Sequence, residues 1–358
     1  MMNLSSTVDA RLVHNNDGLD FLIRDKNTFH ARDCSVIFND GSLKDELELR
    51  VKHNLAIEKV EGKCLRAVFY DFQRQVVTNP IEAPSIRTME LGNAVEKMEV
   101  GYYKSIGIFH SAHNRMFNKE YQISGEIDNL IWEYQDILLP DGSLSGRVTI
   151  NEPRRLVGVE IKSFYGYYAE KEILNEGKPK WNHVLQSLVY LDHYKPHIPY
   201  WLLVYSTRGG PVDTPLGRTT SRQFKLQISK ASGDVFIDGR IVKEFNIDSM
   251  FKRFKEAQFY LDSNKLPSRD YVYNYPDELV EVRYRKGAIT KRKYTDWQKG
   301  NCFVSDWQCQ YCNYLAECWQ DVHGDKVRGA KTEVVEEEAV VEKPKRTKPK
   351  NKKEQRNG

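Results

Sequence analysis

The chain has 358 residues, of which 40% are hydrophobic and 29% charged, so it is long enough to bury a substantial core. No apolar stretch approaches the roughly 20 residues that a membrane-spanning helix needs, which excludes a helical membrane protein. The net charge of +4 falls mostly in residues 331–358, which have nine Lys/Arg and six Glu. The first 330 residues hold 45 basic and 44 acidic side chains, so the chain is not uniformly basic.

The two ends of the chain differ in composition from its middle. Residues 1–63 are expected to form a lead-in of mixed structure. Residues 331–358 have an acidic block followed by a Lys/Pro block, which predicts a disordered charged tail. The first residues lack a basic segment leading into an apolar one, so we expect a cytoplasmic protein with reduced thiols.

Between these ends, helix and strand patterns alternate. The spacing of apolar residues first predicts a helix over 91–109 and strands over 121–133 and 156–164, with a hairpin turn at Asp141-Gly142 between the two strands. It then predicts a helix over 181–194 and a strand over 200–205. The last predicted elements are a hairpin of 223–229 and 234–242 and a helix over 247–261. This order predicts an α/β fold with a central mixed β-sheet flanked by helices.

Charged residues interrupt two of these strands. Glu160 and Lys162 share one face of their strand because side chains repeat every two residues, while Val159 and Ile161 face the core. The preceding strand offers Asp128. Carboxylate oxygens of this kind suit Mg²⁺ or Mn²⁺, so the set predicts a divalent-cation pocket; a solvated ion pair on an edge strand is the alternative.

Four motifs in a fixed order resemble the PD-(D/E)XK nuclease superfamily, and within it the RecB-like exonucleases that include CRISPR-adaptation and phage recombination nucleases. They are Gly92-Asn93-Ala94-Val95-Glu96, Gly125-Glu126-Ile127-Asp128, Glu160-Ile161-Lys162 and Gln186-Ser187-Leu188-Val189-Tyr190. The resemblance implies a restriction-endonuclease-like core, here over residues 64–320.

The resemblance also implies roles for individual residues. Asp128 and Glu160 would bind the metal ion together with Glu96 and the backbone carbonyl of Ile161, and Lys162 would orient the attacking water. The family usually has His at the position of Glu96, and a carboxylate there would still bind Mg²⁺. Gln186 and Tyr190, four residues apart on one helical face, would line the active site and contact DNA.

The cysteines are unevenly spaced. Cys309, Cys312 and Cys318 follow a C-x₂-C-x₅-C pattern, which indicates a zinc or iron–sulfur site whose fourth ligand is either Cys302 or the distant Cys64. The resemblance favours Cys64, which begins a C-x-R motif, and implies a [4Fe–4S] cluster that joins the two ends of the nuclease domain; Zn²⁺ is the alternative. Cys34 and Cys302 would then be unliganded.

Basic residues with interleaved aromatics form the densest candidate DNA contact. They are Arg283, Arg285, Lys286, Lys291, Arg292 and Lys293, with Tyr284, Tyr294 and Trp297. Such a stretch suits single-stranded DNA, because cations pair with phosphates and rings stack on bases; a basic hairpin facing water is the alternative. Arg208, Arg218 and Arg222 are weaker candidates.

These observations predict a Mg²⁺- or Mn²⁺-dependent DNA exonuclease with an iron–sulfur cluster. It would hydrolyse phosphodiester bonds in single-stranded or end-opened DNA during recombination, repair or phage DNA processing, in the cytoplasm of a bacterium or a phage-infected host. Two other functions stay open: a structure-specific endonuclease, and a non-catalytic DNA-binding partner of a helicase. No Walker phosphate-binding loop is visible, so an ATP-driven motor would come from another chain.

Overall fold

The computed structural model of the chain describes residues 28–323 apart from positions 74, 76, 78, 142, 143 and 216. The tail predicted over residues 331–358 lies outside the described residues. In the part that is described, no helix combines the length and the apolar character needed to cross a bilayer.

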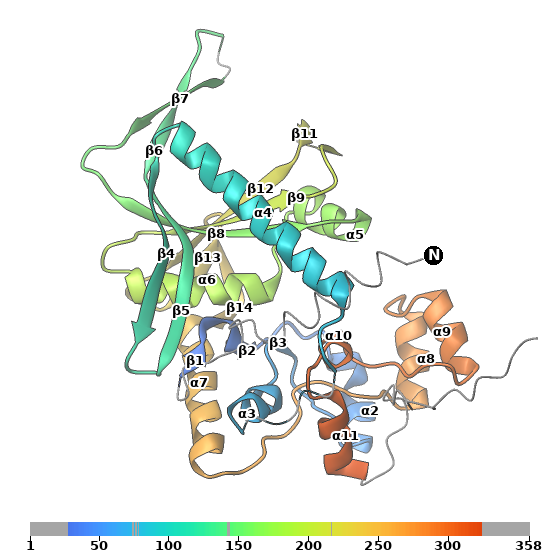
Figure 1. Cartoon of the computed structure of the whole chain (residues 1–358). Coiled ribbons are helices and arrows are strands. Elements are labelled where there is room, and N and C mark those ends of the chain that lie inside the picture. The colour runs from blue at the N-terminus through green and yellow to red at the C-terminus, as the bar shows by residue number, and fades with distance from the viewer. Residues whose placement is uncertain are drawn as a thin grey trace, which may run out of the picture.

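A mixed sheet of eight strands forms the centre of the fold (Figure 1). Its order is β1-β5-β8-β9-β12-β13-β14, with β4 on the other edge of β5. The strands are β1 (Phe29–His30), β4 (Phe109–Asn118), β5 (Ile123–Trp132), β8 (Leu156–Phe164), β9 (Trp201–Thr207), β12 (Ser221–Ile228), β13 (Asp234–Ile237) and β14 (Arg240–Asn246).

Smaller elements surround this sheet. The additional strands pair as β2 (Ser35–Ile37) with β3 (Val60–Gly62), β6 (Tyr134–Leu138) with β7 (Leu144–Ile150), and β10 (Val212–Thr214) with β11 (Gly217–Thr219). The helices are η2 (Ala31–Asp33), η3 (Lys44–Glu46), α2 (Leu47–Lys52), α3 (Leu65–Gln73), α4 (Ala83–Ser105), α5 (Tyr167–Glu170), η4 (Lys171–Asn175), α6 (Trp181–Tyr194), α7 (Ile247–Asp262), α8 (Asp277–Arg285), α9 (Lys291–Gln298), α10 (Trp307–Gln310) and α11 (Leu315–His323).

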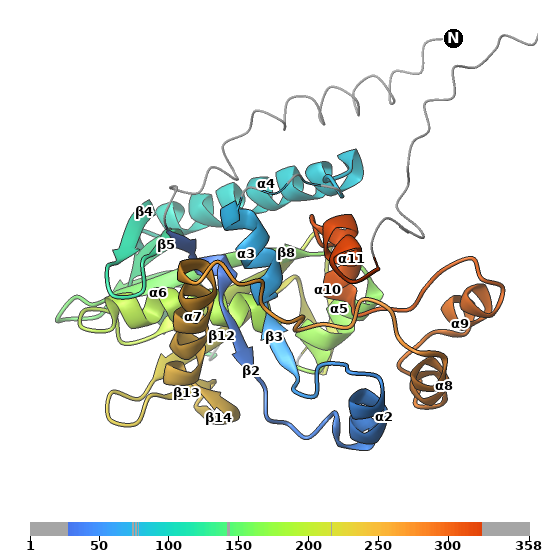
Figure 2. The same cartoon turned by 90° about the horizontal axis from the view of Figure 1, so that it is seen from below.

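Helices cover both faces of the sheet, as Figures 1 and 2 show for α4 on one side and α6 with α7 on the other. On the α4 side, Val157, Val159 and Ile161 of β8 form a buried cluster against which Tyr103 of α4 packs. The opposite face carries the main core. There α6 is buried over eight consecutive residues, Val184 to Leu191, which is typical of a helix enclosed on all sides.

The connection between β8 and β9 explains the position of α6. These two strands are parallel, from the pair Gly158↔Trp201 to the pair Phe164↔Thr207. Parallel neighbours need a long crossover, and α6 lies in it. The predicted order of strand, strand, helix and strand is therefore confirmed, and so is the mixed sheet flanked by helices.

Three details differ from the sequence-based expectation. The predicted helix over 91–109 begins earlier, at Ala83, and ends at Ser105, so that Phe109 already begins β4. The predicted strand over 234–242 is two strands, because Asp238 and Gly239 both adopt positive φ and form the turn of the β13–β14 hairpin. The predicted hairpin around position 141 is present as β6–β7, although Gly142 lies outside the described residues.

The boundary predicted between residues 63 and 64 does not separate two units. Phe29 in β1 pairs with Ile123 of β5 in the main sheet, and Phe29 and Val36 are buried in the main core. The segment that the sequence presented as a lead-in supplies part of the sheet, because a two-residue strand carries too little periodicity to be recognised.

Candidate functional site

The candidate site lies where β5 and β8 stop pairing. Their antiparallel ladder ends at the pair Asn129↔Val159, and continuing the register by one residue sets Asp128 opposite Glu160. There the Oδ2 atom of Asp128 accepts a hydrogen bond of 2.8 Å from the backbone N–H of Ile161. The Asp128 carboxylate thus occupies the place of a strand partner, which orients it toward β8.

Glu160 is the most enclosed member of the site. Its side chain is fully buried, and its Oε1 atom accepts a hydrogen bond of 2.5 Å from Nζ of Lys162. Its Oε2 atom is buried and has no hydrogen-bond partner among the described residues. Burial raises the pKa of Glu160 to about 7, with a further upward contribution from Asp128 that Lys162 opposes.

Glu96 joins these two carboxylates from α4. This helix crosses β8, with Gly92 next to the hydroxyl of Ser163. Burial raises the pKa of Glu96, and the charge of Glu160 raises it further. Burial likewise raises the pKa of Asp128, where Lys162 lowers it and Glu96 raises it. The charges of three carboxylates from three elements, Glu96, Asp128 and Glu160, therefore raise one another's pKa values.

The carboxylates are not arranged as a preformed metal site. Across the described ranges, no group of three or more His, Cys, Asp or Glu side chains is placed so that it could hold a metal ion. Glu160 is paired with Lys162, and Asp128 with the amide of Ile161.

Gln186 and Tyr190 lie together on α6, facing β5. Gln186 donates to the Tyr190 hydroxyl (Nε2 to OH, 3.2 Å), and this hydroxyl donates to the carbonyl oxygen of Glu126 (3.0 Å). A Cβ at Gly125 would lie 2.7 Å from the Tyr190 ring. Both side chains are buried, so in this structure they hold β5 in place and do not face solvent.

The charge of Arg32, a residue that the sequence did not single out, also acts on these carboxylates. Arg32 is exposed on η2, and its positive charge lowers the pKa of Glu96, Asp128 and Glu160. The η2 turn is fixed by two hydrogen bonds, from the Arg32 amide to Nδ1 of His30 (2.9 Å) and from the His30 amide to Oδ2 of Asp33 (2.8 Å). No motif marks Arg32, because only the pairing of β1 with β5 brings it here.

The four cysteines that the resemblance grouped line one cavity. This cavity has a volume of about 30 Å³, and its wall includes Cys64, Cys309, Cys312 and Cys318. Cys302 is not part of the wall; its thiol lies 3.7 Å from the carbonyl oxygen of Lys293. Burial raises the pKa of Cys64 to about 12 and also raises the pKa values of Cys309 and Cys312, so without a metal ion these groups are neutral thiols.

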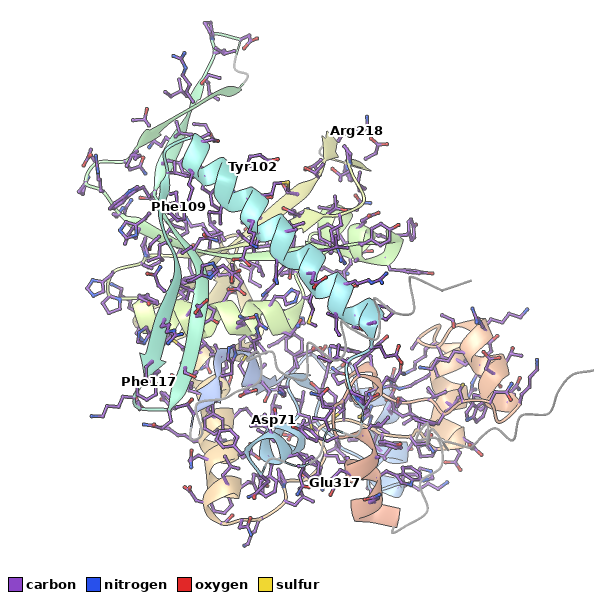
Figure 3. The ribbon with its side chains drawn as sticks, in the orientation of Figure 1. Asp71, Tyr102, Phe109, Phe117, Arg218 and Glu317 are labelled. Atoms are coloured by element: carbon purple, nitrogen blue, oxygen red, sulfur yellow. The ribbon has the colours of Figure 1, made fainter. Side chains whose placement is uncertain are left out.

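Protein contacts already join the two ends of the domain around this cavity. The Tyr314 hydroxyl bonds to Asp71, and the rings of Tyr70 and Tyr314 lie 5.5 Å apart. Figure 3 labels Asp71 on α3 and Glu317 on the neighbouring α11. Arg269 donates from Nε to the sulfur of Cys318 at 3.1 Å, so a cation also borders the cavity.

The basic and aromatic stretch forms two helices, α8 and α9, and its rings are paired with each other. Tyr284 and Tyr294 stack at 3.8 Å between centroids. Arg283 bonds to Glu46 and lies over the Tyr275 ring, 4.1 Å from its centroid. These contacts stabilise the junction of α8 with α9 and η3. The DNA contact predicted for this stretch stays a prediction.

The three weaker arginine candidates differ in position. Arg222 donates to the carbonyl of Leu174 (2.8 Å), and Arg208 to that of Thr88 (3.3 Å), so both have internal bonds. Arg218 is exposed at the β10–β11 hairpin (Figure 3).

Comparison with known proteins finds no match: no protein-family model matches the chain, and no curated protein matches its sequence.

Proposed function

We propose that the chain is a divalent-metal-dependent deoxyribonuclease with a restriction-endonuclease-like core. The observation that carries the proposal is the juxtaposition of Asp128, Glu160 and Lys162 at the end of the β5–β8 ladder. A surface ion pair would be solvated, whereas here Glu160 is fully buried and one of its oxygens has no partner among the described residues. Burying such a group costs free energy, which a role in binding would explain.

The residues fit a hard divalent cation. Asp128, Glu160 and Glu96, with the carbonyl of Ile161, offer only oxygen donors, and Oε2 of Glu160 is an unused buried acceptor. The cation would supply positive charge that polarises a phosphoryl oxygen. Glu160 has to be ionised for this role. Burial raises its pKa, whereas the charge and hydrogen bond of Lys162 favour the ionised form, in which the pair is neutral overall.

The protein's own cations have distinct tasks in this proposal. Lys162, which is 16% exposed and held by Glu160, would orient a water molecule or stabilise charge on the phosphate. Arg32 on η2, whose positive charge also lowers the pKa of these carboxylates, would bind a phosphate oxygen of the DNA backbone. Gln186 and Tyr190 would position β5 through the Glu126 carbonyl.

The four thiols that line one cavity supply the donor atoms of the proposed [4Fe–4S] cluster, with Zn²⁺ as the alternative, although among the described residues their sulfur atoms are not grouped closely enough to hold a metal ion. Thiolates are the preferred ligands of both. A cluster there would cross-link the residue that precedes α3 to α10 and α11, and Tyr70 of α3 already packs against Tyr314 beside this cavity.

The proposal is tested by degradation of end-labelled linear DNA in the presence of Mg²⁺ or Mn²⁺. Asp128→Ala and Lys162→Ala should each lower the rate by at least a hundredfold, while Lys299→Ala, an exposed residue after α9, should leave it unchanged. Unchanged degradation in both site variants would overturn the catalytic assignment.

A circular single-stranded substrate separates the two enzymatic alternatives. An exonuclease leaves the circle intact, whereas a structure-specific endonuclease opens it. Binding of DNA without any metal-dependent cleavage would instead favour the non-catalytic partner of a helicase.

A further inference from the structure

Three exposed tyrosines follow the end of β8. Tyr165, Tyr167 and Tyr168 expose 69%, 70% and 82% of their surface. Large aromatic side chains are usually more buried than this, and here three of them lie within four positions of the chain.

An ordered turn presents these rings. Gly166, with φ of 100°, starts α5, and the amide of Arg208 donates to the carbonyl of Phe164 (2.9 Å). The Tyr165 ring packs beside Gly209, where an added Cβ would lie 3.4 Å from it. The rings of Tyr167 and Tyr168 lie 5.5 Å apart in an edge-to-face arrangement. The exposure therefore belongs to a defined conformation of the chain.

The patch borders the candidate site. Tyr165 lies three residues beyond Lys162, which at about 3.3 Å per residue is a distance of roughly 10 Å along β8. Figure 1 shows α5 at the end of the sheet that α4 crosses. A DNA strand with one phosphate at Lys162 would therefore pass next to these rings.

The charges around the patch indicate which ligand it suits. Lys178 and Lys180, on the segment that follows α5, are paired with Glu176 and Glu172. Because these two cations are paired with carboxylates, the three exposed rings are the binding groups that this described segment offers. A duplex hides the faces of its bases, whereas unpaired bases offer them to aromatic side chains.

We propose that Tyr165, Tyr167 and Tyr168 form a stacking platform for the unpaired bases of single-stranded DNA next to the candidate site. The location of the platform relative to chemistry rests on the proposed function, whereas binding itself can be measured independently of cleavage.

The test is fluorescence anisotropy of a short fluorescein-labelled oligothymidylate with the full chain in a chelator, so that no cleavage occurs. Tyr167→Ala and Tyr168→Ala should each weaken binding about tenfold, since stacking on one ring contributes roughly that factor. Tyr168→Phe should bind as the wild type does, and Tyr168→Leu should bind as Tyr168→Ala does, because stacking needs an aromatic face. Phe259→Ala, which removes a ring that is 59% exposed on α7, is the matched control and should not alter binding.

Two results would overturn the platform: equal binding by wild type and the Tyr167→Ala/Tyr168→Ala double variant, or full binding by Tyr168→Leu. A duplex bound more tightly than the oligothymidylate would also overturn it. These outcomes differ from failure of the proposed function, because a chain that binds through the tyrosines but never cleaves DNA with Mg²⁺ or Mn²⁺ would support the platform and refute the nuclease.

Discussion

Gly125 shows how two distant motifs depend on each other. It belongs to the Gly125–Asp128 motif on β5, and Tyr190 belongs to the motif on α6. The Tyr190 ring occupies the space that a Gly125 side chain would need. The glycine therefore allows Tyr190 to reach the carbonyl of Glu126, which places the strand that carries Asp128.

We expect Gly125→Ala to lower the free energy of unfolding by about 1 to 3 kcal/mol, because the added Cβ overpacks a rigid contact. Gly101→Ala is the matched control: nothing lies within 4 Å of its new Cβ inside α4, so the better helix former should stabilise the chain by about 0.5 to 1 kcal/mol. Urea unfolding followed by circular dichroism measures both. Changes of opposite sign in the free energy of unfolding of the two variants support the packing argument, whereas a stabilising Gly125→Ala contradicts it.

Among individual residues, strand alternation was sufficient to place Glu160 and Lys162 on one face, and the structure has their charged atoms in contact. The same reasoning could not find Arg32 or the orphaned oxygen of Glu160. Both depend on neighbours that are distant in sequence, namely β5 and the end of its ladder with β8.

Among the elements, α7 connects several parts of the molecule through a buried arginine. Arg253 donates to Asp270 (2.8 Å), to Glu256 (2.7 Å) and to the hydroxyl of Ser35 in β2 (3.3 Å). Asp270 also accepts the backbone N–H of Leu65 at the start of α3 (2.7 Å). The network thus joins α7 to β2 and to the helix that follows Cys64.

Arg253→Met should lower the free energy of unfolding by about 3 to 5 kcal/mol, because it leaves the carboxylate of Asp270 buried without its cation. The control is Arg292→Met, at a side chain that is 94% exposed, where the change should stay within about 0.5 kcal/mol. Chemical denaturation measures the two variants side by side. A similarly small decrease in the free energy of unfolding of both variants would show that the Arg253 network contributes little to stability.

Element types were predictable where the periodicity was strong, as for β8 and α6, whose observed bounds equal the predicted ones. The basic and aromatic stretch is helical, as α8 and α9, so the hairpin named as its alternative structure is wrong. In these helices the rings of Tyr284 and Tyr294 stack on each other.

At the scale of the whole molecule, the cysteine cavity joins residues that lie more than 200 positions apart. We expect anaerobically purified wild-type protein to contain iron and acid-labile sulfide and to absorb visible light. Cys64→Ser should lose all three signals and unfold more easily. By analogy with a disulfide that closes a loop of over 100 residues, the free energy of unfolding should fall by about 4 to 5 kcal/mol.

Cys302→Ser is the matched control, since this thiol does not line the cavity. It should keep iron, sulfide, colour and stability. A colourless protein that contains stoichiometric zinc would refute the iron–sulfur assignment and support the alternative ligand. Loss of colour in Cys302→Ser but not in Cys64→Ser would refute the grouping of the four cysteines.

Local patterns in the sequence were enough to predict the α/β class, the order of the central strands and helices, and the shared face of Glu160 and Lys162, because these follow from periodicity within a few residues. The resemblance of the motifs also grouped Cys64 with Cys309, Cys312 and Cys318, and the structure places all four around one cavity. Tertiary structure alone decided two other features: it paired β1 with β5, and it left Tyr165, Tyr167 and Tyr168 exposed after the end of β8. Each depends on contacts between segments far apart in the chain, and such contacts leave no periodic trace in the sequence.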